Sequence, residues 1–205
     1  GGLYVIDMYR ELIEGGAFLA PPILQHVDPA AGVDKGRVWR IVPKDFKPRP
    51  RPKLSAASTA ELVRMLEHPD GWHRDTASRL LYQRQDRAAI ESLVKLAKES
   101  KSPVGRVHAL YALQGLSAIP PEFPSQLLRD PHPRVRQHVI RVAGGKNPDL
   151  QRLADDLAAD DDARVRLELA WALGDAPGES SARTLWKLAQ RDAVDPTARL
   201  AIAAS

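Results

Sequence analysis

One arginine recurs along most of this chain at a nearly constant spacing, each time at the start of an apolar helical stretch. These residues are Arg74, Arg106, Arg136, Arg166 and Arg199, which lie 32, 30, 30 and 33 positions apart. Four residues before each arginine lies a candidate helix cap, at Asp70, Ser102, His132, Asp162 and Asp195. A period in this range is typical of a solenoid, in which each repeat buries its apolar face against its neighbours. Such a pattern predicts a surface for partners rather than a catalytic pocket.

Each repeat is predicted to contain two helices joined by a short turn. The second helix starts at the cap, where Asp or Ser accepts hydrogen bonds from otherwise unpaired amides, and a proline next to it fits because its missing N–H has no partner there. Apolar residues three and seven positions after the arginines form a stripe along these helices. The first helices are predicted over 59–67, 87–99, 122–129, 149–159 and 180–191. The fold class is therefore mainly α, with an α-solenoid of about five helix pairs over residues 55–205.

Residues 1–43 contain the strand signals of the chain, at 3–6 and 38–42, where β-branched and aromatic residues are frequent. We expect a short two-stranded β segment with a long insertion, in which 8–14 form a helical turn and Pro21-Pro22 ends whatever precedes it. Two strands alone are marginally stable in water, so they either pack on the helices or belong to a larger sheet. Because the chain starts almost directly on a strand and without Met, we expect it to be a piece of a longer protein.

Residues 44–54 are predicted to be a basic, proline-rich linker between the two parts. The alternating prolines Pro48, Pro50 and Pro52 favour an extended polyproline II path. A stiff spacer is the simplest interpretation, and docking against an acidic surface or a nucleic-acid backbone is the alternative.

The composition excludes several classes of function. The 205 residues carry a net charge of +4, which indicates nucleic-acid binding only where the charge is clustered. The absence of cysteine excludes disulfides, thiolate metal sites, covalent haem attachment and cysteine nucleophiles in this chain. No apolar run approaches the roughly 18 residues of a membrane span, so no span is expected in this chain.

Residues 133–136 (Pro-Arg-Val-Arg) and 163–166 (Ala-Arg-Val-Arg) start second helices in a way that resembles HEAT repeats. The resemblance is to the short kind, of about 30 residues, found in phycobilisome-lyase-like proteins. It covers residues 59–202, and 71–74 (Gly-Trp-His-Arg) depart from it, as expected of a terminal repeat. The resemblance implies a protein-binding array.

Residues 3–10 (Leu-Tyr-Val-Ile-Asp-Met-Tyr-Arg) and 34–43 (Asp-Lys-Gly-Arg-Val-Trp-Arg-Ile-Val-Pro) resemble the last blade of a sorbosone/glucose-dehydrogenase-like β-propeller. Such blades occur in large membrane-bound dehydrogenases of the planctomycete type, often followed by HEAT repeats and a c-type cytochrome domain. The resemblance implies a bacterial, periplasmic or exported parent, a quinone- or sugar-linked dehydrogenase, whose cofactor pocket lies upstream. No cofactor is expected in this chain itself.

The arginine column is the strongest candidate for a functional site. Guanidinium groups on successive helices could line a surface for an anionic ligand. The alternative, which we favour, is that they pair with carboxylates of the neighbouring repeat and lock the stacking. On that interpretation, replacing Arg136 or Arg166 by Ala lowers the melting temperature.

A second candidate site is Asp7, Tyr9 and Arg10, which directly follow the first strand, where a loop residue can reach a ligand. Local pairing of Arg10 with Glu11 or Glu14 is the alternative interpretation. No catalytic residue set and no metal site are predicted. The acidic cluster of Asp155, Asp156, Asp160, Asp161 and Asp162 lacks the spacing of a calcium loop, and the six histidines are dispersed.

These observations predict a protein-interaction or inter-domain scaffold segment of a larger dehydrogenase, with a protein or a neighbouring domain of the same polypeptide as partner. One alternative is a direct contribution of residues 7–10 to a quinone-dependent sugar-type dehydrogenase site. Another is a free-standing HEAT-repeat module that binds nucleic acid, against which the interspersed acidic residues argue. The apolar stretch 200–205 lacks the polar outer face of a capping repeat, so we expect the array to continue or to pack on another copy.

Overall fold

The computed structural model describes residues 2–13, 15–47, 53–176, 178–192 and 194–204. The chain divides into two compact units, Gly1–Pro52 and Lys53–Ser205, so the boundary falls within the predicted linker. The alternating prolines for which an extended path is predicted lie at 48–52, outside the described residues.

The N-terminal unit contains a two-stranded antiparallel sheet of β1 (Leu3–Asp7) and β2 (Arg37–Ile41). Val5 pairs with Trp39 and Asp7 with Arg37, which confirms the predicted β segment. The insertion differs from the prediction, since residues 8–13 form no helix. The short helices are η1 (Gly16–Phe18) and α1 (Pro21–Leu24). The two prolines thus open α1, at positions whose N–H groups have no partner within a helix.

The side chains of this unit lie at the surface. Successive residues of a strand point to opposite faces of the sheet, and both faces carry apolar side chains. Val5 and Trp39 on one face are 41% and 51% exposed, and Ile6 on the other is 77% exposed. None of the described residues of the unit is buried. The unit therefore has little apolar core of its own.

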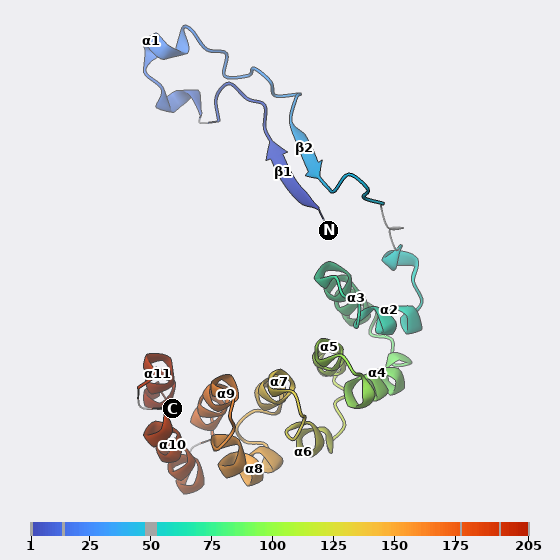
Figure 1. Ribbon diagram of the computed structural model, residues 1–205, viewed down its shortest axis with the longest axis vertical. Coiled ribbons are helices and arrows are strands. Elements are labelled where there is room, and N and C mark those ends of the chain that lie inside the picture. Colours follow the sequence, from blue (N-terminus) through green and yellow to red (C-terminus); the bar gives the residue numbers. More distant parts are fainter. Residues whose placement is uncertain (1, 14, 48–52, 177, 193, 205) are drawn as a thin grey trace. The chain divides into compact units, whose positions relative to one another are not determined.

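The second unit is an array of five helix pairs, preceded by the short turn η2 (Leu54–Ala56). The first helices are α2 (Thr59–Met65), α4 (Ala89–Glu99), α6 (Phe123–Leu127), α8 (Pro148–Ala158) and α10 (Glu179–Arg191). The second helices are α3 (Gly71–Arg84), α5 (Pro103–Gly115), α7 (Pro133–Ala143), α9 (Ala163–Gly174) and α11 (Pro196–Ala204). Figure 1 shows the second helices side by side in one layer, with the first helices in the other. This two-layer array confirms the predicted fold class.

The predicted caps fix where the second helices begin. Asp70, Ser102 and Asp162 each accept a hydrogen bond from an amide two or three residues further on. His132 caps α7 through Nδ1, which accepts a 3.2 Å hydrogen bond from the Arg134 amide. Asp195 accepts from the amides of Thr197 and Ala198 at the start of α11. These bonds satisfy amides that have no partner within the helix.

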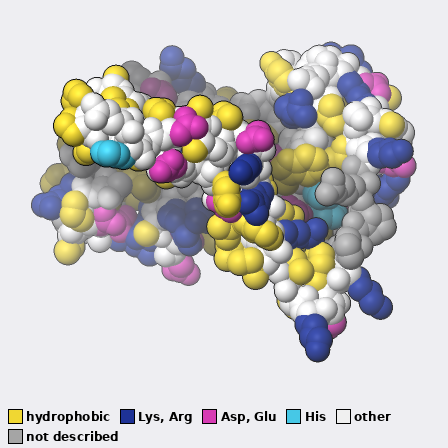
Figure 2. Space-filling model, turned by 90° about the horizontal axis from the view of Figure 1, so that it is seen from above, with side chains coloured by type: hydrophobic (Ala, Val, Ile, Leu, Met, Phe, Trp, Pro, Cys, Tyr) yellow, Lys and Arg dark blue, Asp and Glu magenta, His cyan; other side chains and the backbone are white. Residues whose placement is uncertain are grey.

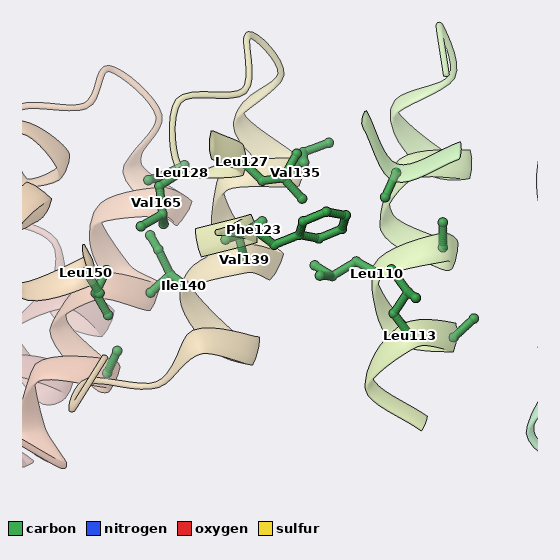
Figure 3. Packing of buried hydrophobic residues seen from close by; sticks show 14 of the residues in the cluster. Leu110, Leu113, Phe123, Leu127, Leu128, Val135, Val139, Ile140, Leu150 and Val165 are labelled. Atoms are coloured by element: carbon green, nitrogen blue, oxygen red, sulfur yellow. The ribbon is translucent and has the colours of Figure 1, made fainter. Parts of the chain in front are cut away.

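The core lies between the two layers and runs from repeat to repeat. Phe123 of α6 points toward Leu110 of α5, and both are 1% exposed (Figure 3). Val139 and Ile140 of α7 continue the same cluster. Because each repeat buries its apolar side chains against the next, the array positions its second helices as one row.

Candidate functional site

The recurring arginines join successive repeats, and we call Arg74, Arg106, Arg136 and Arg166 the arginine ladder. In all four, Nη1 donates to the backbone oxygen six residues earlier, at 2.6 Å to His68 and Ser100 and at 2.7 Å to Asp130 and Asp160. The guanidinium groups of Arg106, Arg136 and Arg166 also reach an aspartate of the following repeat, which is Asp130, Asp160 and Asp192 respectively. Each arginine therefore ties its own turn to the next repeat.

Two of these pairs have two parallel hydrogen bonds. Arg136 donates Nε and Nη2 to the Asp160 oxygens at 2.7 and 2.8 Å. Arg166 donates to Asp192 at 2.7 and 2.5 Å. The hydrogen bond with the aspartate raises the pKa of both arginines. This planar arrangement is the strongest that arginine makes with a carboxylate.

Two of the aspartates that pair with the ladder arginines also accept a hydrogen bond from the amide of the cap residue of their own second helix. Asp130 Oδ1 accepts from Arg106 Nη2 and from the His132 amide, both at 2.8 Å. Asp160 Oδ1 likewise accepts from the Asp162 amide at 2.9 Å. The prediction that the arginines pair with carboxylates of the neighbouring repeat is thus confirmed for Arg106, Arg136 and Arg166.

The two end arginines of the column differ from the central three. Arg74 makes the same backbone contact, but its Nε donates to His108 Nε2 at 3.3 Å instead of to an aspartate. The position that carries an aspartate in later repeats is Ser100 here, so this arginine contacts a histidine instead. Arg199 is exposed at the start of α11.

A second set of polar contacts joins the second helices along their exposed side. Tyr111 Oη and His138 Nδ1 are 2.9 Å apart, and Arg141 donates to both Glu168 oxygens at 2.8 and 2.5 Å. Burial, followed by a nearby arginine, lowers the pKa of His108 and of His138, and burial raises the pKa of Tyr111. Burial therefore shifts both histidines toward the neutral form.

In the N-terminal unit, Asp7 joins the two strands. Its Oδ2 accepts from Trp39 Nε1 at 3.1 Å, and its Oδ1 accepts from the Tyr9 amide at 3.0 Å. The hydrogen bond from Trp39 lowers the pKa of Asp7. The cation of Arg37 lies 4.4 Å from the centroid of the Tyr9 ring. Asp7, the first of the three candidate residues, therefore stabilises the hairpin through local hydrogen bonds.

Tyr9 and Arg10 lie beside a surface hollow that Glu11, Ala31, Gly32 and Lys35 also line. Tyr9 has a left-handed backbone with φ of 47°, and a Cβ at Gly32 would lie 1.8 Å from the Tyr9 oxygen. Only glycine fits that approach. Arg10 donates to the Pro29 oxygen at 2.6 Å, and not to Glu11 as one interpretation expects, while its Nε is buried without a partner. Glu14, the other expected partner, lies outside the described residues.

Residues of the acidic cluster form ion pairs and a helix cap within the array. Asp155 contacts Lys187 Nζ at 2.7 Å and accepts from Thr184 at 3.0 Å. Asp160 pairs with Arg136 of the ladder, and Asp162 caps α9. Within the part of the chain that the structure describes, no three His, Cys, Asp or Glu side chains are grouped to hold a metal ion.

Among the described residues, no helix combines the length and the apolar character that crossing a membrane requires.

Comparison with known families divides the chain in a similar way. A family model described as HEAT repeats matches residues 121–205, which include α6 to α11. A model described as a domain of unknown function, DUF7133, matches residues 1–45, which include β1 and β2. No curated protein matches the chain. HEAT repeats are typical of protein-interaction and scaffold modules, and neither description names a propeller or a dehydrogenase.

Several residues of the site are not identified by the sequence reasoning. Asp130 and Asp192 are not identified, and the spacing of six residues that Asp130 and Asp160 share before an arginine gives His68 and Ser100 in the earlier repeats. Tyr111 and Glu168 are also missed. Their partners lie 27 residues away in the chain, and no sequence signal marks them.

Proposed function

We propose that this chain is a scaffold segment that holds a partner protein, or a neighbouring domain of the same polypeptide, on the row of second helices. The observation that carries the proposal is the arginine ladder, which locks each repeat to the next by charged hydrogen bonds. A row of helices locked in this way is a preformed surface, so the array itself loses little conformational entropy when a partner binds. The ladder arginines act here by positioning the repeats, and their direct contact with an anionic ligand is the weaker alternative.

The larger polypeptide in this proposal is a dehydrogenase whose propeller supplies further strands to the N-terminal sheet. Support comes from the resemblance of residues 3–10 and 34–43 to a propeller blade. Further support comes from the exposure of apolar side chains on both faces of the hairpin. Strands that are apolar on both faces are typical of sheets covered on both sides.

Site-specific photo-crosslinking in the source cells tests the scaffold role. A photoreactive residue replaces Trp171 on second helix α9 or, as a matched control, Trp186 on first helix α10, since both side chains are exposed. We expect a reproducible protein adduct, or an intrachain crosslink to another domain, from position 171 and not from 186. Equal yields from both positions, or none from 171, would overturn the scaffold role.

The dehydrogenase context has a separate test. The native protein is isolated from its source cells, and its intact mass is measured together with a haem stain of the same band. A haem-positive species several times larger than 22.6 kDa supports the proposal. A haem-negative species near 22.6 kDa removes the dehydrogenase from it and leaves a free-standing binding module.

A second candidate function is a direct contribution of Asp7, Tyr9 and Arg10 to the dehydrogenase site. It is favoured by the left-handed backbone of Tyr9 and by the unpaired, buried Nε of Arg10 beside the hollow. Backbone strain of this kind is frequent at functional sites. The test is turnover of the native protein with a quinone acceptor after Arg10→Ala, with Arg40→Ala on β2 as control. Equal turnover in the two variants would exclude this role.

A further inference from the structure

The exposed side of the second helices has an unusual composition. In α3, α5, α7 and α9, the positions two before, two after and five after the ladder arginine recur at helical spacing and lie on one face. We call these positions the second-helix face. It carries four further arginines, Arg79, Arg134, Arg141 and Arg164, against one carboxylate, Glu168.

These cations remain accessible. The side chains of Arg141 and Arg164 are 53% and 55% exposed, although each already contacts a carboxylate, Glu168 and Asp162 respectively. Arg79 and Arg134 are exposed as well. Arg134 contacts the neutral Gln137 at 2.9 Å and Arg79 contacts the neutral Gln83 at 3.4 Å. Glu168 is only 11% exposed and is already held by Arg141. With Asp75, next to the face on α3, and Asp162, the partner of Arg164, the four arginines stand against three carboxylates, so the net charge stays positive by one.

Apolar and aromatic side chains alternate with these cations. Trp72 and Trp171, at the two ends of the face, are 63% and 49% exposed, and Val104 between them is 45% exposed. Figure 2 views the molecule from above and shows hydrophobic side chains in yellow beside Lys and Arg in dark blue on its surface. Exposed aromatic rings and arginines are the residue types that dominate the energy of protein interfaces.

We propose that the second-helix face binds an extended acidic peptide segment of another protein or domain. This inference rests on the proposed scaffold function and adds the chemistry of the partner. Arginine side chains bind carboxylates through paired hydrogen bonds, so acidic residues of the segment meet Arg134, Arg141 and Arg164. Apolar residues between them cover the exposed tryptophans.

The spacing of the helices sets the length and pattern of such a segment. Packed helices lie about 8–10 Å apart, and an extended chain advances about 3.3 Å per residue. Every third residue of the segment therefore reaches the next helix. Crossing from α3 to α9 requires about ten residues, with acidic residues opposite α3, α7 and α9, the helices whose face positions carry arginine.

The distribution of charge favours an acidic peptide over a nucleic acid. A backbone of phosphates needs an uninterrupted track of cations. Here the position two before the ladder arginine carries Trp72 and Val104 in the first two repeats and arginine only in the next two. Glu168 also lies within the face, where it would repel a phosphate.

The test is a binding titration of the full chain with a fluorescent ten-residue peptide of repeating Glu-Leu-Ser. The same peptide with Lys in place of Glu, and a ten-nucleotide single-stranded DNA, are the comparison probes. The variant Arg134→Glu/Arg164→Glu reverses two exposed charges of the face. The variant Arg152→Glu/Arg183→Glu reverses two exposed charges on the first helices α8 and α10 and serves as the matched control.

We expect the acidic peptide to bind the unaltered chain at least tenfold more tightly than the Lys peptide. The face variant is expected to lose at least tenfold in affinity, and the control variant less than twofold. Helical content by circular dichroism confirms that both variants fold. Equal affinity for the two peptides, equal effects of the two variants, or tighter binding of the DNA would each overturn the inference.

The peptide titration and the crosslinking experiment can fail independently. Crosslinks from position 171 without acidic-peptide binding would refute the partner chemistry and keep the scaffold role. Peptide binding without crosslinks in the cell would refute the scaffold role, because the surface would then have no partner there.

Discussion

The N-terminal unit and the helical array are both rich in apolar residues, but they use them in opposite ways. In the array, Leu62, Leu113 and Leu169 are fully buried, whereas Leu3 and Ile6 of the hairpin are 64% and 77% exposed. The difference follows from how each structure hides its side chains. A helix pair covers one apolar stripe with its own partner and a second with the next repeat. A two-stranded sheet has two faces and nothing within the unit to cover either.

The largest effect should come from the core of the array. Phe123→Ala removes a ring that is 1% exposed, and we expect it to lower the free energy of unfolding by about 3–5 kcal/mol. Trp39→Ala on the hairpin, at 51% exposure, should change the unfolding of the array by less than about 0.5 kcal/mol. Urea denaturation followed by far-ultraviolet circular dichroism measures both. A similar loss in the two variants would mean that the hairpin contributes to the core.

The ladder should come next, because its charges are mostly withdrawn from water. Arg166 and Asp192 have side chains that are 9% and 14% exposed, and Arg166→Ala leaves the aspartate without its partner. We expect a loss of about 3 kcal/mol. Arg164→Ala, two residues away and 55% exposed, is the matched control and should cost at most about 1 kcal/mol. Equal melting temperatures for the two variants would contradict the locking role of the ladder.

The caps should have a smaller effect. Asp162 accepts from the Arg164 amide at 2.9 Å, and Asp162→Ala is expected to cost about 1 kcal/mol. Asp161→Ala, at the neighbouring fully exposed position, should cost less than about 0.5 kcal/mol. Thermal unfolding of the two variants side by side measures the difference. A larger loss from Asp161 would show that the acidic turn has another role.

The smallest effect should be a dependence of stability on pH. Burial lowers the pKa of His108 and His138 below 6.5, so the folded array binds fewer protons than the unfolded chain. The stability that neutral histidines contribute is present above pH 6.5 and is lost as the pH falls below it. Denaturation midpoints at pH 7.5 and 5.5 should differ, and His108→Gln/His138→Gln should reduce the difference. An unchanged difference in the double variant would assign it to other groups.

The periodic residues made the array predictable. Cap, proline and arginine recur together, and each second helix begins within one residue of its predicted cap. The pairing of Arg106, Arg136 and Arg166 with carboxylates could also be predicted, because an arginine withdrawn from water needs a counter-charge. The insertion in the N-terminal unit was less predictable. Pro21 and Pro22 suit the start of a helix as well as the end of one, and only the surrounding chain decides between the two.

The sequence by itself determined the repeat, the helix boundaries and the two-stranded segment, since caps, prolines and apolar periodicity act over a few residues of chain. Only the tertiary structure decided that Asp130, Asp160 and Asp192 receive the arginines, and that Tyr111 meets His138 and Arg141 meets Glu168. Those partners are 24 to 27 residues apart in the chain. Their meeting depends on how one repeat stacks on the next. It is this stacking that gathers the arginines and tryptophans of α3, α7 and α9 on one exposed face.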